Sequence, residues 1–228
     1  MSYATAYGKF EMKKLFVLVL LFTVSVYAFG AVSLPEGGDN NGKFMYRGFS
    51  GGMLLHSGHV QSGNFTLHNA EGTFSRNMQL NGIPFGIGGS MRLHFGAHFR
   101  LGIEGYTSEY SYANKSSVST GWGGILADYS WQAGRFIPFA GGTIGGGKQK
   151  NLSLLEAPHD GYDGFVTDEN VSYRQFGFLC FAPFVGTEFV LNTKVHLVLK
   201  IDYLINLSNP QTDFVTGARV YIGFLFCR

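Results

Sequence analysis

Apolar residues alternate with small or polar residues along most of this chain. The segment from Gly82 to Phe95 shows the pattern most clearly. One face carries Ile83, Phe85, Ile87, Met91, Leu93 and Phe95, and the other carries Pro84, Gly86, Gly88, Ser90, Arg92 and His94. A period of two residues predicts a β-strand. In a soluble protein the apolar face would point into the core, whereas in a membrane barrel it points at lipid and the polar face lines the lumen.

The alternation predicts eight strands whose connections differ regularly in length. The expected strands are 43–56, 82–95, 98–112, 120–132, 136–147, 171–190, 195–205 and 214–227. Tight turns at 96–97, 133–135 and 192–193 alternate with longer loops at 57–81, 113–119, 148–170 and 206–213. Outer-membrane barrels have an even number of strands, short periplasmic turns and longer external loops. The predicted fold is therefore an all-β, eight-stranded antiparallel up-and-down transmembrane β-barrel, which also removes exposed sheet edges.

The N-terminal region predicts export. A basic start at 12–14 is followed by an uncharged apolar stretch, 15–28, that ends in a small residue. This order is typical of a cleaved signal peptide, and the stretch is shorter than the roughly 20 residues of a transmembrane helix. We expect a signal peptide at 1–28, with Met12 as the true start. A flexible periplasmic leader at 29–42 and a barrel domain at 43–228 follow.

Composition and charge support the membrane interpretation. The whole chain has 17 basic and 15 acidic residues, and removal of Lys9, Lys13, Lys14 and Glu11 with the signal peptide leaves 14 of each. The mature chain is thus neutral and has no basic run, so no nucleic-acid partner is indicated. Only 14% of the residues are charged, whereas 33 are glycine and 16% are aromatic. Such a composition suits strands that contact hydrocarbon.

From Lys43 to Cys227 the chain resembles the small eight-stranded outer-membrane barrels, the OmpA transmembrane domain and OmpX-like group. The resemblance rests on the strand–turn rhythm, on Pro-Phe-Ala-Gly-Gly at 138–142 opening a glycine-rich strand, and on the alternating last strand. It implies a monomer in the bacterial outer membrane that contacts membrane lipids and lipopolysaccharide and is inserted by the barrel-insertion machinery. Members usually end on an aromatic residue that this machinery recognises, whereas here Cys227 and Arg228 follow Phe226.

Ionisable residues at polar-face positions are expected to point into the lumen. They are Arg92, His94, Arg100, Glu104, Asp128, Glu188, Lys200, Asp202 and Arg219. An eight-stranded barrel is just wide enough for side chains to fill. Because unpaired buried charges are costly, we expect opposite charges to pair across strands and plug the lumen. A narrow channel is the alternative.

His56, Ser57 and His59 are the weak catalytic candidates, because they stand at the outer end of the first predicted strand. Some eight-stranded barrels that modify lipid A carry catalytic groups at this rim. Catalysis would also need a base oriented by a third group, which no spacing in the chain indicates. A lipid-modifying barrel enzyme therefore stays an alternative, and no enzymatic activity is the main expectation.

Two further motifs are incomplete, so we expect no cofactor. The Gly142–Lys148 stretch has the glycine and lysine spacing of a phosphate-binding loop, but Gln149 replaces the required Ser or Thr and no amphipathic helix follows. The acidic residues Asp160, Asp163 and Asp168 are weak metal candidates, because they lack the spacing of a calcium-binding loop.

Cys180 and Cys227 stand on strands that are not expected to be neighbours, so both thiols are predicted to be free.

The sequence thus favours an outer-membrane barrel with a structural or surface-interaction role, carried by the loops 57–81 and 148–170. A soluble exported β-barrel is a further alternative. The surface ligand is left open.

Overall fold

A computed structural model describes residues 46–68, 75–112, 116–154, 171–208 and 211–228. The predicted signal peptide and leader lie outside these residues. Among the described residues there is no helix long and apolar enough to cross a membrane.

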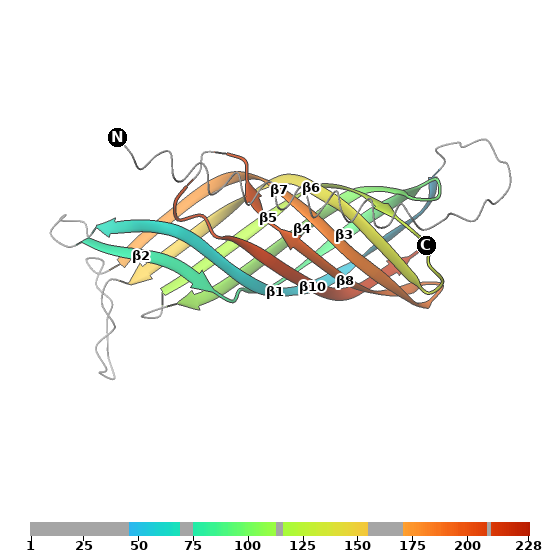
Figure 1. Cartoon of the computed structure of the whole chain (residues 1–228), viewed down its shortest axis with the longest axis horizontal. Coiled ribbons are helices and arrows are strands. Elements are labelled where there is room, and N and C mark those ends of the chain that lie inside the picture. Colours follow the sequence, from blue (N-terminus) through green and yellow to red (C-terminus); the bar gives the residue numbers. More distant parts are fainter. Residues whose placement is uncertain (1–45, 69–74, 113–115, 155–170, 209–210) are drawn as a thin grey trace. The chain divides into compact units, whose positions relative to one another are not determined.

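The described residues form one antiparallel sheet of ten strand segments (Figure 1). The segments are β1 (Tyr46–His68), β2 (Ser75–Gly82), β3 (Phe85–Phe95), β4 (Phe99–Tyr112), β5 (Ser116–Ser130), β6 (Phe136–Leu154), β7 (Val171–Asn192), β8 (Val195–Tyr203), β9 (Ile205–Asn206) and β10 (Thr216–Cys227). Both β2 and β3 pair with β1, and the register is kept across the gap between them, from the pair Ser57 and Phe85 to the pair Val60 and Gly82. Both β8 and β9 pair with β7. Pro84 lies in the gap between β2 and β3. Proline has no backbone N–H and therefore cannot donate a hydrogen bond to the neighbouring strand, which accounts for the interruption. The ten segments therefore make eight barrel strands, as predicted.

The sheet closes on itself because the last strand pairs with the first. β10 lies antiparallel to β1 from the pair Ser50 and Cys227 to the pair Gln61 and Thr216. The short turns after β3, β5 and β7 and the C-terminus lie at one end of the barrel, here called the turn end (Figure 1). The opposite end, where β1, β4, β6 and β9 finish, is called the loop end. The predicted closed, up-and-down β-barrel is confirmed.

Two of the three predicted tight turns are confirmed, and the third is shifted. Gly96 and Gly134 adopt φ of +59° and +65°, a left-handed conformation that glycine takes at little cost. The turn between β7 and β8 is at Thr193 and Lys194, one residue later than predicted. The reason is that the Asn192 carboxamide oxygen accepts hydrogen bonds from the Lys194 and Val195 amides, which fixes the turn beyond it.

The predicted long loop at 57–81 is wrong. β1 continues to His68, and β2 runs back beside it. This region is therefore a hairpin that extends two barrel strands at the loop end, beyond the band of outward apolar side chains described below. The prediction failed because the outward positions His59 and Gln61 are polar while Val60 is buried inside. Where a strand leaves the hydrocarbon, an outward residue need not be apolar. In this part of β1 the polar residues point outward and the apolar Val60 points inward, which is the reverse of the pattern on which the prediction depended. β6 likewise continues through 148–154.

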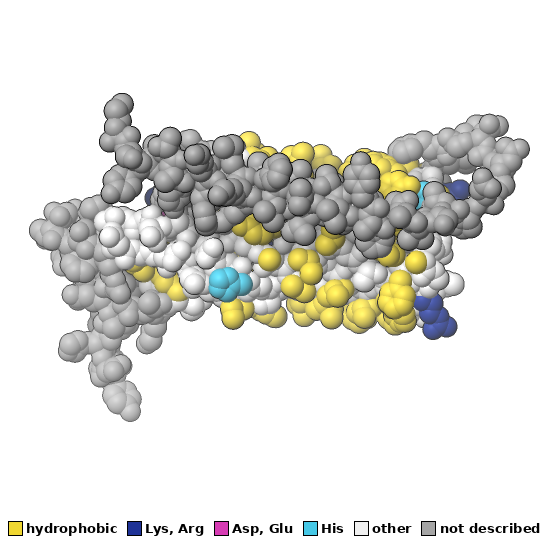
Figure 2. Space-filling view, in the orientation of Figure 1, with side chains coloured by type: hydrophobic (Ala, Val, Ile, Leu, Met, Phe, Trp, Pro, Cys, Tyr) yellow, Lys and Arg dark blue, Asp and Glu magenta, His cyan; other side chains and the backbone are white. Residues whose placement is uncertain are grey.

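Large apolar side chains cover the outside of the barrel. Met53, Phe85, Ile125 and Ile144 are each 64–65% exposed, and Figure 2 shows apolar side chains over the middle of the visible barrel surface. The alternate positions on the same strands point inward, where polar, charged and aromatic side chains mix with buried aliphatic ones such as Leu54 and Leu126. A soluble monomer rarely exposes so large an apolar surface, whereas a barrel in lipid requires it.

Candidate functional site

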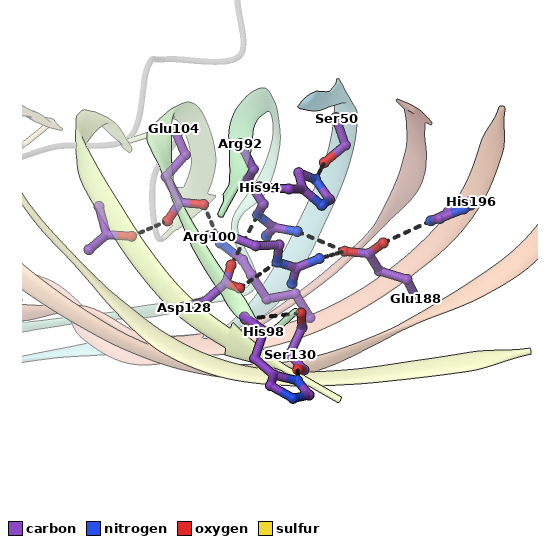
Figure 3. Close-up of polar contacts among 12 residues, drawn as sticks. Ser50, Arg92, His94, His98, Arg100, Glu104, Asp128, Ser130, Glu188 and His196 are labelled. Atoms are coloured by element: carbon purple, nitrogen blue, oxygen red, sulfur yellow. Dashed lines mark hydrogen bonds and ion pairs between the residues drawn. The ribbon is translucent and has the colours of Figure 1, made fainter. Parts of the chain in front are cut away.

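The turn half of the lumen holds a network of four charged side chains (Figure 3). Arg92 on β3 places its Nε 3.3 Å from Asp128 Oδ2, and its guanidinium donates to Glu188 Oε1 at 3.2 Å. Arg100 on β4 donates from Nε to Asp128 Oδ1 at 2.5 Å and also to Glu188. All four side chains are at most 2% exposed. Two positive and two negative charges thus compensate one another in the interior.

Further polar groups complete this network on its turn side. His196 Nδ1 lies 2.9 Å from the second oxygen of Glu188. His94 pairs through Nε2 with Ser50 Oγ at 2.9 Å, also visible in Figure 3. The Phe139 ring lies beneath both guanidinium groups, 4.8 and 5.0 Å from their central carbons. An apolar ring and the paired charges thus lie together inside this end of the barrel.

A second cluster lies around Lys200 on β8, nearer the middle of the lumen. Its Nζ donates to Glu104 Oε2 at 2.8 Å, and Thr143 donates to the other oxygen of Glu104 at 2.6 Å. The ammonium also lies 4.8 Å from the ring centre of Tyr106 and 4.3 Å from that of Tyr221. Contact with aromatic faces stabilises a cation that is removed from water. Lys200 is thus held by the Glu104 carboxylate and by aromatic faces.

Asp202 and Arg219 occupy directly opposed positions on β8 and β10. Both are at most 2% exposed, and Asp202 also lies 3.9 Å from Lys200 Nζ. All nine ionisable residues assigned to polar faces by the sequence therefore lie inside the barrel, with His94 only partly buried and the other eight fully buried.

The loop half of the lumen is closed by the chain itself, which the sequence did not predict. The segment from Asp213 to Val215, just before β10, folds inward and is buried. Gln149 on β6 holds it, donating to the Asp213 carbonyl at 2.7 Å and accepting from the Val215 amide at 3.1 Å. Asn151 donates to Asp213 Oδ2 at 2.8 Å. The polar residues Gln149 and Asn151 at inward positions of a strand are the only signal that could have indicated such an anchor.

An apolar layer accompanies this inward segment. Its buried members are Val60, Leu80, Tyr110, Val118 and Val215. Phe65 and Tyr112 pack against it, and the Tyr112 hydroxyl pairs with Ser153 Oγ at 2.6 Å. Burial raises the pKa of the Tyr112 phenol above its ordinary value. The charged pairs, the aromatic rings and this apolar layer therefore all lie inside the barrel.

The structure does not bring the weak catalytic candidates together. His56 is 2% exposed inside the barrel, where its ring stacks on Tyr221 with 4.8 Å between centroids. Ser57 and the exposed His59 lie on the outer face of β1. The sequence analysis placed these residues at the outer end of their strand, and this prediction is wrong because β1 continues to His68.

The other predicted motifs have simple structural explanations. Gly142–Lys148 lies within β6, and none of the described residues after it forms a helix. Cys180 and Cys227 are free, as predicted. The candidates Asp160, Asp163 and Asp168 lie outside the described residues, within which no cluster of His, Cys, Asp and Glu could hold a metal ion.

Comparison with known proteins identifies the class of fold. No family model and no curated protein matches the chain. Among solved structures, Neisserial surface protein A (NspA) is similar, with a TM-score of 0.51 and 11% identity over 80% of this chain and 98% of that one. Ail of Yersinia pestis is also similar, with a TM-score of 0.42 and 13% identity over 79% of this chain and 99% of that one. OprG of Pseudomonas aeruginosa has a TM-score of 0.44 and 10% identity over 80% of this chain and 97% of that one. This chain therefore has the fold of the small outer-membrane β-barrels.

Proposed function

We propose that this protein is a monomeric outer-membrane protein that spans the membrane as a closed, non-conducting barrel and acts through the loop end at the cell surface. Residues 1–28 would direct its export and be removed, and the barrel-insertion machinery would place it among the phospholipids and lipopolysaccharide of the outer membrane. The outward apolar face and the fold support this location. We assign the protein no catalytic role.

The observation that carries the proposal is the pairing of charges across the lumen. Arg100 on β4 contacts Glu188 on β7, and Lys200 on β8 contacts Glu104 on β4. Each pair therefore joins two strands that are not neighbours in the sheet. A charge pair that crosses the lumen obstructs it. Opening a path would break several such pairs, each of which is expensive to break in a buried environment.

Conductance in planar lipid bilayers tests the closed lumen. The refolded protein is expected to give no steady conductance, with a general porin as the positive control. The matched variant combines Arg92→Gly and Arg100→Gly, which removes both guanidinium groups from the charged network and should introduce openings. Persistent openings in the unchanged protein would contradict the proposal.

A surface-interaction role is proposed for the loop end, because that end extends farthest from the apolar band. β1 and β7 are 23 and 22 residues long, about twice what a membrane crossing needs. The proposed interacting parts are the β1–β2 hairpin and the 148–170 region. Protease added to intact cells is expected to cut the chain at the loop end. Cleavage only after the outer membrane has been permeabilised would contradict this orientation.

A further inference from the structure

The loop end of the lumen contains a blind polar pocket of about 310 Å³. β1 supplies one wall, including Phe65, and β6 and β7 supply the facing wall, including Ser172 and Arg174. Asp213, from the segment that folds inward, also lines it. Phe65 at the same time packs on the buried apolar layer. The pocket is therefore separate from the charged network in the turn half of the lumen.

Asp213 gives the pocket its most specific chemistry. It is 1% exposed, and its Oδ2 accepts a hydrogen bond from Asn151 and lies 3.4 Å from Arg174 Nε. Its Oδ1 has no hydrogen-bond partner among the described residues. A buried acceptor without a donor is costly, so a ligand that donates a hydrogen bond to this atom would gain stability once a small side-chain shift uncovers it.

The charge balance decides between ligand classes. Because Arg174 already compensates Asp213, a cation would gain little in the pocket, and an anion attracted by Arg174 would be repelled by Asp213. The remaining lining residues are neutral, and their polar groups include the carboxamides of Asn64 and Asn151 and the hydroxyls of Ser153 and Ser172. These groups donate and accept hydrogen bonds, which suits a ligand rich in hydroxyl groups.

We propose that this pocket binds one neutral pyranose sugar, either free or as the terminal unit of a glycan. A hydroxyl of the sugar would donate to Asp213 Oδ1, and its apolar face would lie on Phe65. The volume is at the lower end of the range for small-molecule pockets, about 300–1,000 Å³, and suits a single ring. This inference rests on the proposed function, because it identifies the kind of ligand that the surface-exposed loop end would recognise.

The test is saturation-transfer NMR on the full chain refolded in lauryldimethylamine oxide micelles, whose headgroups are not sugars. The probes are the methyl α-glycosides of glucose, galactose and mannose. Ser172→Phe adds a ring inside the pocket, and Ser119→Phe makes the same change at an outward position of β5. Asp213→Asn is a second pocket variant, and heat-modifiable gel mobility verifies folding of each.

At least one glycoside is expected to give a saturable signal with the unchanged protein and with Ser119→Phe. Binding should weaken by about tenfold or more in Ser172→Phe and in Asp213→Asn, the scale expected when a site loses a buried hydrogen bond. Comparison of the bound monosaccharide with its linear trisaccharide distinguishes a free sugar from a glycan end.

Three results would overturn the inference: no saturable signal from any glycoside, equal binding by the pocket variants, or tighter binding of inorganic phosphate or choline than of every glycoside. The micelle experiment needs no particular cellular location and no conductance. Its failure would therefore leave the proposed closed outer-membrane barrel intact, whereas steady conductance would contradict that barrel without affecting sugar binding.

Discussion

Arg100 and Asp128 are opposed residues on the neighbouring strands β4 and β5, and their side chains form a buried ion pair with the Arg100 Nε 2.5 Å from the Asp128 Oδ1. The same guanidinium also contacts Glu188 on β7. One arginine therefore links adjacent strands within the wall and a third strand beyond them. This arrangement explains how a barrel can bury charged side chains in its interior and remain stable.

Glu188→Gln is expected to destabilise the barrel strongly. Among the described residues, the substitution leaves Arg92 and Arg100 with Asp128 as their only ion-pair partner, and removing one member of a buried ion pair costs about 3–5 kcal/mol. Urea titration of the refolded protein in lipid vesicles measures the change in the free energy of unfolding. Glu109→Gln, at an exposed position on β4, is the control and should have little effect. Equal stability of the two variants would show that the network contributes nothing.

Ile125→Arg tests which face meets lipid. Ile125 is 64% exposed, and its outward neighbours on β5 run from Gly121 to Tyr129, which places it near the centre of the apolar band. An outward arginine at the bilayer midplane costs about 2–4 kcal/mol. Ser119→Arg, on the same face beyond this band, should be tolerated in the same vesicle titration. If both variants unfold at the same urea concentration, the lipid-facing assignment is wrong.

Gln149→Leu is expected to release the inward-folded segment. Leucine has nearly the same size but leaves the Val215 amide and the Asp213 carbonyl without their partner. Each unpaired buried group costs about 1–3 kcal/mol, so protease should cut near 211–215 faster than in the unchanged protein. Lys150→Leu, at an exposed outward position next in the chain, is the control. An unchanged cleavage rate would argue against the anchor.

Thiol labelling should distinguish the two cysteines. Cys180 is fully buried, whereas Cys227 is partly exposed at the turn end, with its Sγ 3.5 Å from His196 Nδ1. A maleimide added to the folded protein is expected to modify Cys227 alone, and urea should expose Cys180. Mass spectrometry of the labelled peptides measures both. Rapid labelling of Cys180 in the folded protein would contradict the closed interior.

The sequence predicted the barrel well wherever the strands cross the apolar band. There an outward residue has to be apolar, and its inward neighbour is free to be polar, so alternation assigns Arg92 and Lys200 to the interior, where they lie. Beyond the band this constraint ends. His59 and Gln61 are polar although they point outward, and the strand that carries them was therefore mistaken for a loop.

The lumen contacts could not be predicted for a different reason. Alternation gives the face of a residue but not its partner across the lumen, and Arg100 and Glu188 are separated by 88 positions in the sequence. The pocket depends on β1 facing β6 and β7 and on the inward turn of Asp213. That turn is held by Gln149. In the sequence, Gln149 drew attention only because it stands where a phosphate-binding loop would have Ser or Thr, and this gave no indication of an anchor.

Cell fractionation combined with heat-modifiable gel mobility tests the central claim, a transmembrane β-barrel, most directly. The chain is produced in a Gram-negative host, and the membranes are separated and washed with alkali to remove peripheral proteins. We predict that the protein stays in the outer-membrane fraction and migrates faster before boiling than after it, because the closed barrel resists detergent. Recovery in the detergent-free soluble fraction, or one mobility under both conditions, would contradict the account.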